Sequence, residues 1–285
     1  MYETLTFEIS DHIAHVVFNR PRLRNAMNVT SWRELGEVFN RISEMPEARV
    51  AVLSSTGPHF SAGIDLKSLG SLLDASGEID EGRRREALMR IILELQDTVS
   101  ALEKCRVPVL AAVQGGCIGG GVDIISASDM RYCTEDAYFV IKETEIGMTA
   151  DLGTLQRLPH LIPAGAMREL AFTGRDMAAN EAREIGLVNQ VYVDHESMLA
   201  GVMEIAHQIA AHSPLAQRGV KEMLNFARDH SVADGLNYIA VWNAAMIEGS
   251  EMMEAMAARR GKRAATFNDL LERIDIDPKP KAAAE

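Results

Sequence analysis

The sequence contains few cysteines, little basic charge and no long hydrophobic run. Its 3 cysteines, Cys105, Cys117 and Cys133, have spacings that fit neither a disulfide framework nor a metal site, so we expect reduced core thiols and no bound metal. The net charge of −12 disfavours binding to nucleic acid or to anionic lipid. Apolar runs such as Val107 to Val113 are far shorter than the ~18–20 residues that span a bilayer. The chain is therefore predicted to be globular, without a nucleic-acid or membrane partner.

Targeting signals are also missing from the two ends of the sequence. Glu3, Glu8 and Asp11 lie where a secretory signal needs basic and then apolar residues. The carboxyl end does not carry the Ser-Lys-Leu peroxisomal address. We therefore expect a cytoplasmic protein.

Strand and helix signals alternate along the first two thirds of the chain, which predicts the α/β class. Thr4 to Ile9 and Ile13 to Phe18 predict a hairpin. A helix is predicted from Thr30, with Thr30 or Ser31 as its cap. Further helices are predicted at 83–103, 119–126, 152–158, 163–172 and 178–184, and strands at 50–53, 107–113, 188–193 and near 131 and 139.

Strand signals disappear from about Ser197 onward. We therefore divide the chain into a catalytic region, residues 1–196, and a helical carboxyl-terminal region, residues 197–285. The second region carries methionines at roughly helical spacing, for which core packing is favoured over a subunit interface. These residues are Met223, Met246, Met252, Met253 and Met256.

Two glycine-containing turns are the most informative feature. Phe60 to Lys67 follows a predicted buried strand and leads into a predicted helix, and Gly115 to Asp123 contains three consecutive glycines at a helix start. Glycine inside a helix costs about 1 kcal/mol relative to alanine, so these backbones are expected to approach another group closely. Neither the dinucleotide-binding nor the P-loop spacing is present. Two N–H donors, one from each turn, could instead hold a carbonyl oxygen as it becomes an oxyanion.

Three acidic residues follow these turns: Asp123, Glu143 and Asp151. Taken alone, Glu143 could equally be a solvated surface acid. Asp151 stands just before a predicted helix, where a carboxylate commonly caps the first turn. The residues by themselves leave these alternatives open.

The two turns, together with Asn19-Arg20-Pro21 and Asn25-Ala26, resemble the enoyl-CoA hydratase/isomerase (crotonase) superfamily from about Phe7 to beyond Val193. The resemblance implies a spiral of β-β-α units and a helical carboxyl-terminal region that assembles homotrimers or homohexamers. It also implies an acyl-CoA substrate, with coenzyme A as part of that substrate and no separate cofactor.

The same resemblance implies roles for individual residues. The backbone N–H groups of Ile64 and Gly120 would polarise the thioester carbonyl. Binding of coenzyme A would involve Arg22, Arg24, Ala62, Asp65 and Leu66.

Acids at all three positions resemble the Δ3,5-Δ2,4-dienoyl-CoA isomerase subgroup, because hydratases carry glutamates near Asp123 and Glu143 but glycine in place of Asp151. This subgroup converts 3,5-dienoyl-CoA to 2,4-dienoyl-CoA in fatty acid β-oxidation, removing a proton from C2 and delivering one to C6. We assign C2 to Glu143 and C6 to Asp151, although the reverse stays open, and Asp123 would tune Glu143. The alternatives are an enoyl-CoA hydratase and a non-catalytic homologue that binds RNA or another ligand.

Overall fold

Two β-sheets form the framework of the chain, for which the computed structural model describes residues 2–65, 67–68 and 80–272. In this described part, the large sheet has the order β1-β2-β3-β4-β6-β9 and the small sheet the order β5-β7-β8. Only β1 and β2 pair antiparallel in the large sheet. The strands are β1 (Leu5–Ser10), β2 (Ile13–Phe18), β3 (Val50–Ser55), β4 (Val109–Val113), β5 (Gly116–Ile118), β6 (Met130–Thr134), β7 (Tyr138–Val140), β8 (Met177–Ala178) and β9 (Gln190–Tyr192).

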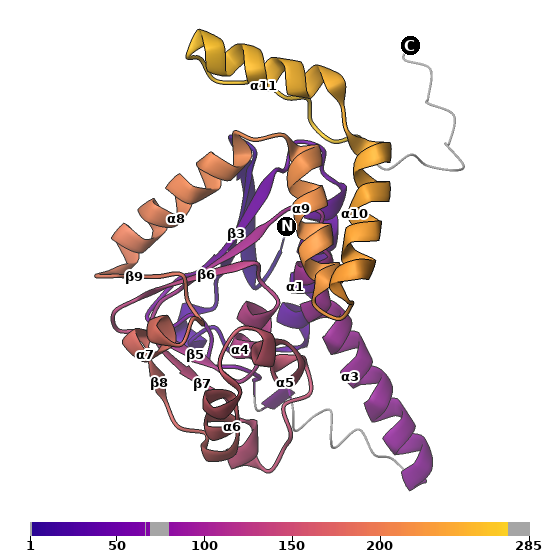
Figure 1. Cartoon of the computed structure of the whole chain (residues 1–285). Helices are drawn as coiled ribbons and strands as arrows, with labels where there is room; N and C mark the ends of the chain where they lie inside the picture. Colours follow the sequence, from indigo (N-terminus) through magenta and orange to yellow (C-terminus); the bar gives the residue numbers. More distant parts are fainter. Residues whose placement is uncertain (1, 66, 69–79, 273–285) are drawn as a thin grey trace, which may run out of the picture.

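Helices connect and cover these strands (Figure 1). The α-helices are α1 (Val29–Glu44), α3 (Glu81–Lys104), α4 (Gly120–Ser126), α5 (Thr154–Arg157), α6 (Ala164–Thr173), α7 (Ala179–Glu184), α8 (His195–Ala210), α9 (Pro214–Ala227), α10 (Val232–Met246) and α11 (Gly249–Gly261). The described residues also form short 3-10 helices: η1 (Pro21–Leu23), η2 (Glu143–Ile146) and η3 (Leu158–His160).

The alternation of side chains along the central strands explains the two hydrophobic layers. Ala51 and Leu53 of β3 face one layer, which also contains the buried face of α1, whereas Val50 and Val52 face the other. Successive residues of a strand point to opposite faces, so a fully buried strand such as β3 needs cover on both sides. In the second layer that cover is α8, whose residues Met198, Val202, Ala206 and Ala210 pack against the sheet.

Most predicted elements are confirmed, with differences where local contacts decide the ends. Helix α1 is capped by Asn28, not by Thr30 or Ser31, because the Asn28 side chain accepts hydrogen bonds from the Ser31 N–H and hydroxyl. Strand β5 lies inside the segment read as a glycine turn and pairs with β7. The helix expected beyond Asp65 cannot be compared, since 66 and 69–79 lie outside the described residues.

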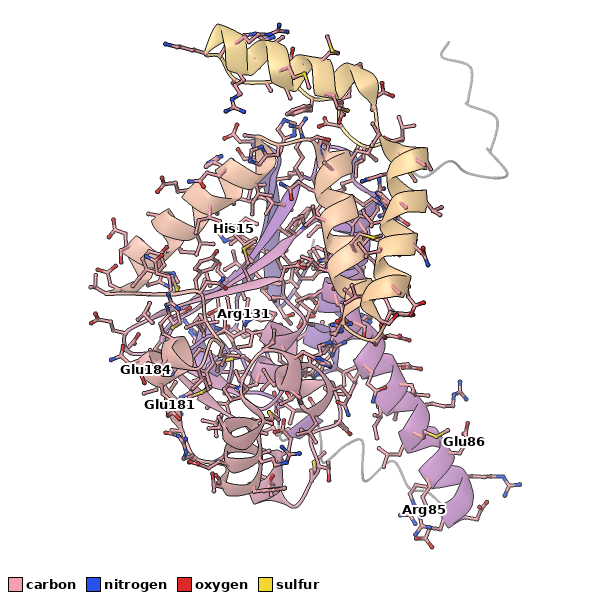
Figure 2. The ribbon with its side chains drawn as sticks, viewed as in Figure 1. His15, Arg85, Glu86, Arg131, Glu181 and Glu184 are labelled. Atoms are coloured by element: carbon pink, nitrogen blue, oxygen red, sulfur yellow. The ribbon has the colours of Figure 1, made fainter. Side chains whose placement is uncertain are left out.

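The buried side chain of Arg131 links the end of α4 to the segment that leads into β9. Arg131, on β6, lies in the interior of the molecule in Figure 2. Its guanidinium donates to the Leu187 carbonyl across 2.7 Å and to the Ser128 carbonyl across 2.6 Å. The contact fixes the end of α4, the helix that begins in the glycine triplet. The three cysteines are buried and form no disulfide, as expected.

Beyond β9 the described chain is helical, and α9 is anchored on the first region by Lys221. Its ammonium donates to the Leu102 and Val107 carbonyls and pairs with Asp129 across 2.7 Å. The expectation that the tail methionines pack in a core is wrong for four of them, since Met246, Met252, Met253 and Met256 are exposed. In the described chain α10 packs mainly against α9, so these methionine side chains have no core to enter. Among the described helices, none combines the length and the apolarity needed to cross a membrane.

Candidate active site

The two predicted turns lie side by side because a short parallel bridge joins them. The Ser61 N–H donates to the Gly116 carbonyl across 3.1 Å, and the Ile118 N–H donates to the Ser61 carbonyl across 3.0 Å. The bridge aligns residues 61–65 with β5 and with the start of α4. Both turns therefore lie at one end of the small sheet.

Gly63 permits the closest contact between the turns. Its φ of +82° is in the left-handed region, and a Cβ there would lie 2.8 Å from the Ile118 carbonyl oxygen and 3.6 Å from the Gly120 nitrogen. Only glycine accepts both the conformation and the contact without strain. In the described part of the chain, neither the Ile64 N–H nor the Gly120 N–H is hydrogen bonded to another group. Two unpaired donors at adjacent turns form the geometry expected of an oxyanion site.

Trp32 of α1 covers this site, and the sequence interpretation missed it. A Cβ on Gly120 would lie 2.9 Å from the six-membered ring of Trp32, so the ring packs directly on the glycine backbone. The indole is buried, and its N–H has no partner within the described residues. A cavity of about 460 Å³ opens beside the ring, lined by Met27, Trp32, Ile64, Ile91 and Leu95 among others.

Asp123 is fully buried on α4, one turn after the oxyanion site begins. Its carboxylate accepts a hydrogen bond from the Thr154 N–H across 2.7 Å, at the first residue of α5. Burial, with a smaller contribution from the negative charge of Asp151, raises the pKa of Asp123 to about 6 against the lowering effects of the Thr154 hydrogen bonds and of Arg157. Asp123 thus both holds the start of α5 and contributes negative charge.

Glu143 lies at the first position of η2, immediately beside the glycine triplet. Its Oε1 is 3.1 Å from the point where a Cβ on Gly119 would stand, and Oε2 is buried without a hydrogen-bond partner in the described chain. Burial raises the pKa of Glu143 to about 7, and the negative charges of Asp123 and Asp151 act in the same direction. A carboxyl group that titrates near neutrality suits proton transfer, and the surface reading of Glu143 is wrong.

Asp151 precedes α5 but does not cap it. The residue at the cap is Gly153, and Asp123 supplies the oxygen that binds the first helical N–H. The Asp151 side chain is half-buried, and burial raises its pKa. Its charge influences both Asp123 and Glu143, which places the three carboxylates in one electrostatic cluster. The capping alternative is therefore wrong, and Asp151 is left available for chemistry.

Comparison with known proteins agrees with this geometry. The enoyl-CoA hydratase/isomerase family profile matches residues 8–270. The chain belongs to the enoyl-CoA hydratase/isomerase family. The fold and family expected from the two turns are confirmed, since the crystal structure of an enoyl-CoA hydratase from Bacillus anthracis superposes with a TM-score of 0.83 at 29% identity, covering 93% of this chain and 99% of that one.

Two curated relatives carry a more specific name. The Δ(3,5)-Δ(2,4)-dienoyl-CoA isomerase of Pongo abelii, named mitochondrial, is 45% identical over 275 residues, which is 94% of this chain and 84% of the relative. The enzyme of that name from Arabidopsis thaliana, named peroxisomal, is 42% identical over 259 residues, which is 90% of this chain and 93% of the relative. An acyl-CoA substrate agrees with the names of the family and of these relatives.

These names correct the expected location. A cytoplasmic protein was expected because no targeting signal was recognised in the sequence, but the relatives are named mitochondrial and peroxisomal. The expectation failed because a targeting signal is recognised by a receptor, so neither the composition nor the fold of a protein reveals its location. The cytoplasmic expectation is therefore contradicted.

The residues expected to bind coenzyme A lie on the first turn and on the loop that precedes it. Arg22 and Arg24 are exposed and form no ion pair within the described residues, while the Arg24 carbonyl accepts the Ala62 N–H across 2.9 Å. Asp65 lies 3.6 Å from Arg20, a residue that the sequence interpretation did not select. Arg20 also donates to the Ala26 carbonyl, so it ties the two loops together. Leu66 lies outside the described residues.

Proposed function

We propose that this protein is a Δ3,5-Δ2,4-dienoyl-CoA isomerase. The observation that carries the proposal is the clustering of Asp151 with Glu143 beside the paired N–H groups of the two turns. A hydratase requires carboxylates that hold water at C2 and C3, whereas the isomerisation requires a second acid at a distance from the first. The relatives at 42–45% identity bear this name, which supports the same activity here.

In the proposed reaction, the Ile64 and Gly120 N–H groups bind the thioester oxygen. Glu143 removes a proton from C2, and the electrons of that C–H bond form a dienolate whose charge rests on the bound oxygen. Asp151 then delivers a proton to C6, and the double bonds move to C2–C3 and C4–C5. Glu143 ends protonated and Asp151 ionised, so exchange of protons with solvent restores the starting state.

The position of Glu143 supports its assignment to C2. C2 is bonded directly to the thioester carbon, so its base must stand next to the oxyanion site. Glu143 lies against Gly119, the neighbour of the donor Gly120. Asp151 belongs to the next loop, which suits the more distant C6. Asp123, buried behind them, keeps the pKa of Glu143 high and holds the start of α5.

The proposal also assigns binding sites to the acyl chain and to the coenzyme A part of the substrate. The cavity beside Trp32 and Ile64 receives part of the acyl chain, because it opens at the oxyanion site and hydrophobic side chains such as Met27, Ile91 and Leu95 contribute to its lining beside polar ones. Arg22 and Arg24, together with Ala62, Asp65 and Leu66, bind coenzyme A, the arginines through its phosphates. No cofactor beyond the substrate's own coenzyme A takes part.

Assembly into a homotrimer or homohexamer completes the proposal, with residues 1–196 as the catalytic region and 197–285 as the assembling region. A groove of about 800 Å³ runs among α9, α10 and α11, and no predicted site residue lines it. Leu224, which lines the groove, is 68% exposed. On the same helices Val241 is 68% exposed and Met253 is 61% exposed. Exposed apolar area of this extent favours burial against a second copy of the chain. Light scattering coupled to size-exclusion chromatography tests the mass, and a monomer would contradict it.

An ultraviolet assay tests the activity. Purified protein is mixed with a 3,5-dienoyl-CoA, and formation of the conjugated 2,4-dienoyl thioester is followed beside a crotonyl-CoA hydration control. Rapid conjugation with little hydration supports the isomerase. Rapid hydration without conjugation favours a hydratase, and silence in both with salt-sensitive RNA binding favours a binding protein.

A further inference from the structure

The loop that carries Asp151 is held from outside by side chains. Gln96 of α3 donates its amide N–H to the Asp151 carbonyl across 2.7 Å. The next carbonyl along the loop, that of Leu152, accepts from Nη1 of Arg157 across 3.2 Å. Two successive peptide groups beside the Asp151 side chain are thereby fixed in direction.

Arg157 is in turn fixed by α3. Its Nη2 lies 3.0 Å from the Ser100 hydroxyl and 3.1 Å from Oε2 of Glu103, and its Nε lies 3.3 Å from the same carboxylate oxygen. Gln96, Ser100 and Glu103 are spaced by one helical turn, so they form a single stripe along α3. The Arg157 and Glu103 side chains are 12% and 16% exposed, and a forked, mostly buried contact of this kind restricts the arginine strongly.

The absence of a side chain at Gly153 leaves the space that the Arg157 guanidinium occupies. The φ of Gly153 is +126°, and a Cβ at this position would stand 1.7 Å from Nη1 of Arg157. Any side chain at 153 would displace the guanidinium from the Leu152 carbonyl. The glycine between Asp151 and α5 is thus a place where Arg157 lies directly on the loop backbone.

Glu103 has a second partner that provides a control. Its other carboxylate oxygen accepts from Arg228, which follows α9, lines the same cavity as the Asp151 loop and forms no hydrogen bond or ion pair with that loop among the described residues. Burial raises the pKa of Glu103, but the two arginines outweigh it, so the pKa lies below its usual value. Glu103 therefore stays ionised at neutral pH, and replacing Arg228 removes a partner of Glu103 without removing a hydrogen bond to the loop.

We propose that Gln96, Arg157 and Glu103 form a clamp of positioning residues for the proton donor. The clamp holds Asp151 at a fixed distance from Glu143, so that a dienolate formed at C2 meets its proton at C6. This inference rests on the proposed isomerase function. The three residues act through the loop and not on the substrate. Because a displacement of about 1 Å can cost ~100-fold in rate, loosening the loop is expected to slow the reaction.

The kinetic test compares Arg157→Gln and Gln96→Leu with Arg228→Gln. The first two variants are expected to lower kcat for 3,5-dienoyl-CoA by about 10–100-fold with KM within about twofold, because acyl-CoA binding does not use the clamp. Arg157→Lys keeps the charge but cannot fork between the loop and α3, so it is expected to recover only part of the rate. Arg228→Gln is expected to keep kcat within about twofold.

Hydrogen exchange supplies a readout that does not depend on activity. The peptide containing residues 151–157 is expected to exchange faster in Arg157→Gln and Gln96→Leu than in the wild type, and at the wild-type rate in Arg228→Gln. Unchanged kcat and exchange in the first two variants, or equal losses in all three, would overturn the clamp. A wild-type protein that does not isomerise 3,5-dienoyl-CoA would overturn the proposed function instead, and the exchange rates would then decide the clamp alone.

Discussion

The carboxylate of Asp123 accepts a hydrogen bond from the backbone N–H of Thr154 across 2.7 Å. This contact joins α4, which begins in the glycine triplet, to α5, which begins just after Asp151. The elements that supply an oxyanion donor and the distal acid are thus held together by the third acid. Asp123 has a structural task as well as an electrostatic one.

Asp151→Asn is expected to abolish most isomerisation and to leave acyl-CoA binding nearly unchanged. Asparagine has nearly the same shape but cannot deliver a proton to C6, and loss of a positioned acid costs about 100–10,000-fold in rate. The ultraviolet assay measures kcat, and calorimetric titration with a saturated acyl-CoA measures binding. Full activity in this variant would remove the two-acid argument.

The pH dependence of kcat/KM reports the proton that Glu143 and Asp151 share. The active form is the pair that carries a single proton; this proton exchanges between the two carboxylates, and the reaction starts from the arrangement in which Asp151 holds it and Glu143 is ionised. The pKa of Glu143 is raised to about 7 by burial and by neighbouring charge, so the pair loses its last proton as pH rises through that range. We therefore expect kcat/KM to fall above about pH 7.

Asp123→Asn supplies the matched variant for this profile. It removes one negative charge near Glu143, which lowers the pKa of Glu143, while the amide oxygen can still accept the Thr154 N–H. The fall in kcat/KM is expected to begin at lower pH than in the wild type. An alkaline limb at the same pH in both proteins would contradict the electrostatic role of Asp123.

Gly63→Ala is expected to damage the oxyanion site. The new methyl group would stand 2.8 Å from the Ile118 carbonyl and would force the two turns apart. Loss of one oxyanion donor costs ~100–1000-fold in kcat, so a decrease of at least about 100-fold is expected. Gly186→Ala is the control: its φ of +87° matches the +82° of Gly63, but the nearest atom would lie at an ordinary 3.6 Å. Equal kinetic losses in both variants would mean that backbone strain alone is responsible.

Arg22→Ala and Arg24→Ala are expected to raise KM for acyl-CoA by up to about fivefold each, with kcat unchanged. Exposed charge contacts contribute up to about 1 kcal/mol and weaken as salt is added. Arg85 is a control, because it lies near the outer end of α3 and points away from the body of the molecule (Figure 2). Steady-state kinetics at low and high ionic strength measure the effect. A KM that is insensitive to these two arginines would place the coenzyme A phosphates elsewhere.

Elements with local signals could be predicted from the amino-acid sequence. Alternating or clustered β-forming residues predicted the hairpin, and short continuous apolar runs predicted the buried strands, because a strand between two layers must be hydrophobic on both faces. The two glycine turns and the three acids carried enough of the family pattern to predict the family. Gly63 and Gly120 illustrate why: close backbone approach permits only glycine, so the requirement is visible in the sequence.

How distant segments meet could not be predicted in this way, because it depends on the fold. Three features of the site depend on contacts between residues far apart in the chain. They are the Ser61–Cys117 bridge, the burial of Glu143 Oε2 without a hydrogen-bond partner, and the packing of Trp32 on Gly120. The sequence allowed Asp151 to be a helix cap, but Asp123 occupies that role from another helix. Arg157 falls within a helix predicted from the sequence, but only the fold places Glu103 beside it. Hydrogen bonds and burial of side chains are set by three-dimensional neighbours, so no local pattern determines them.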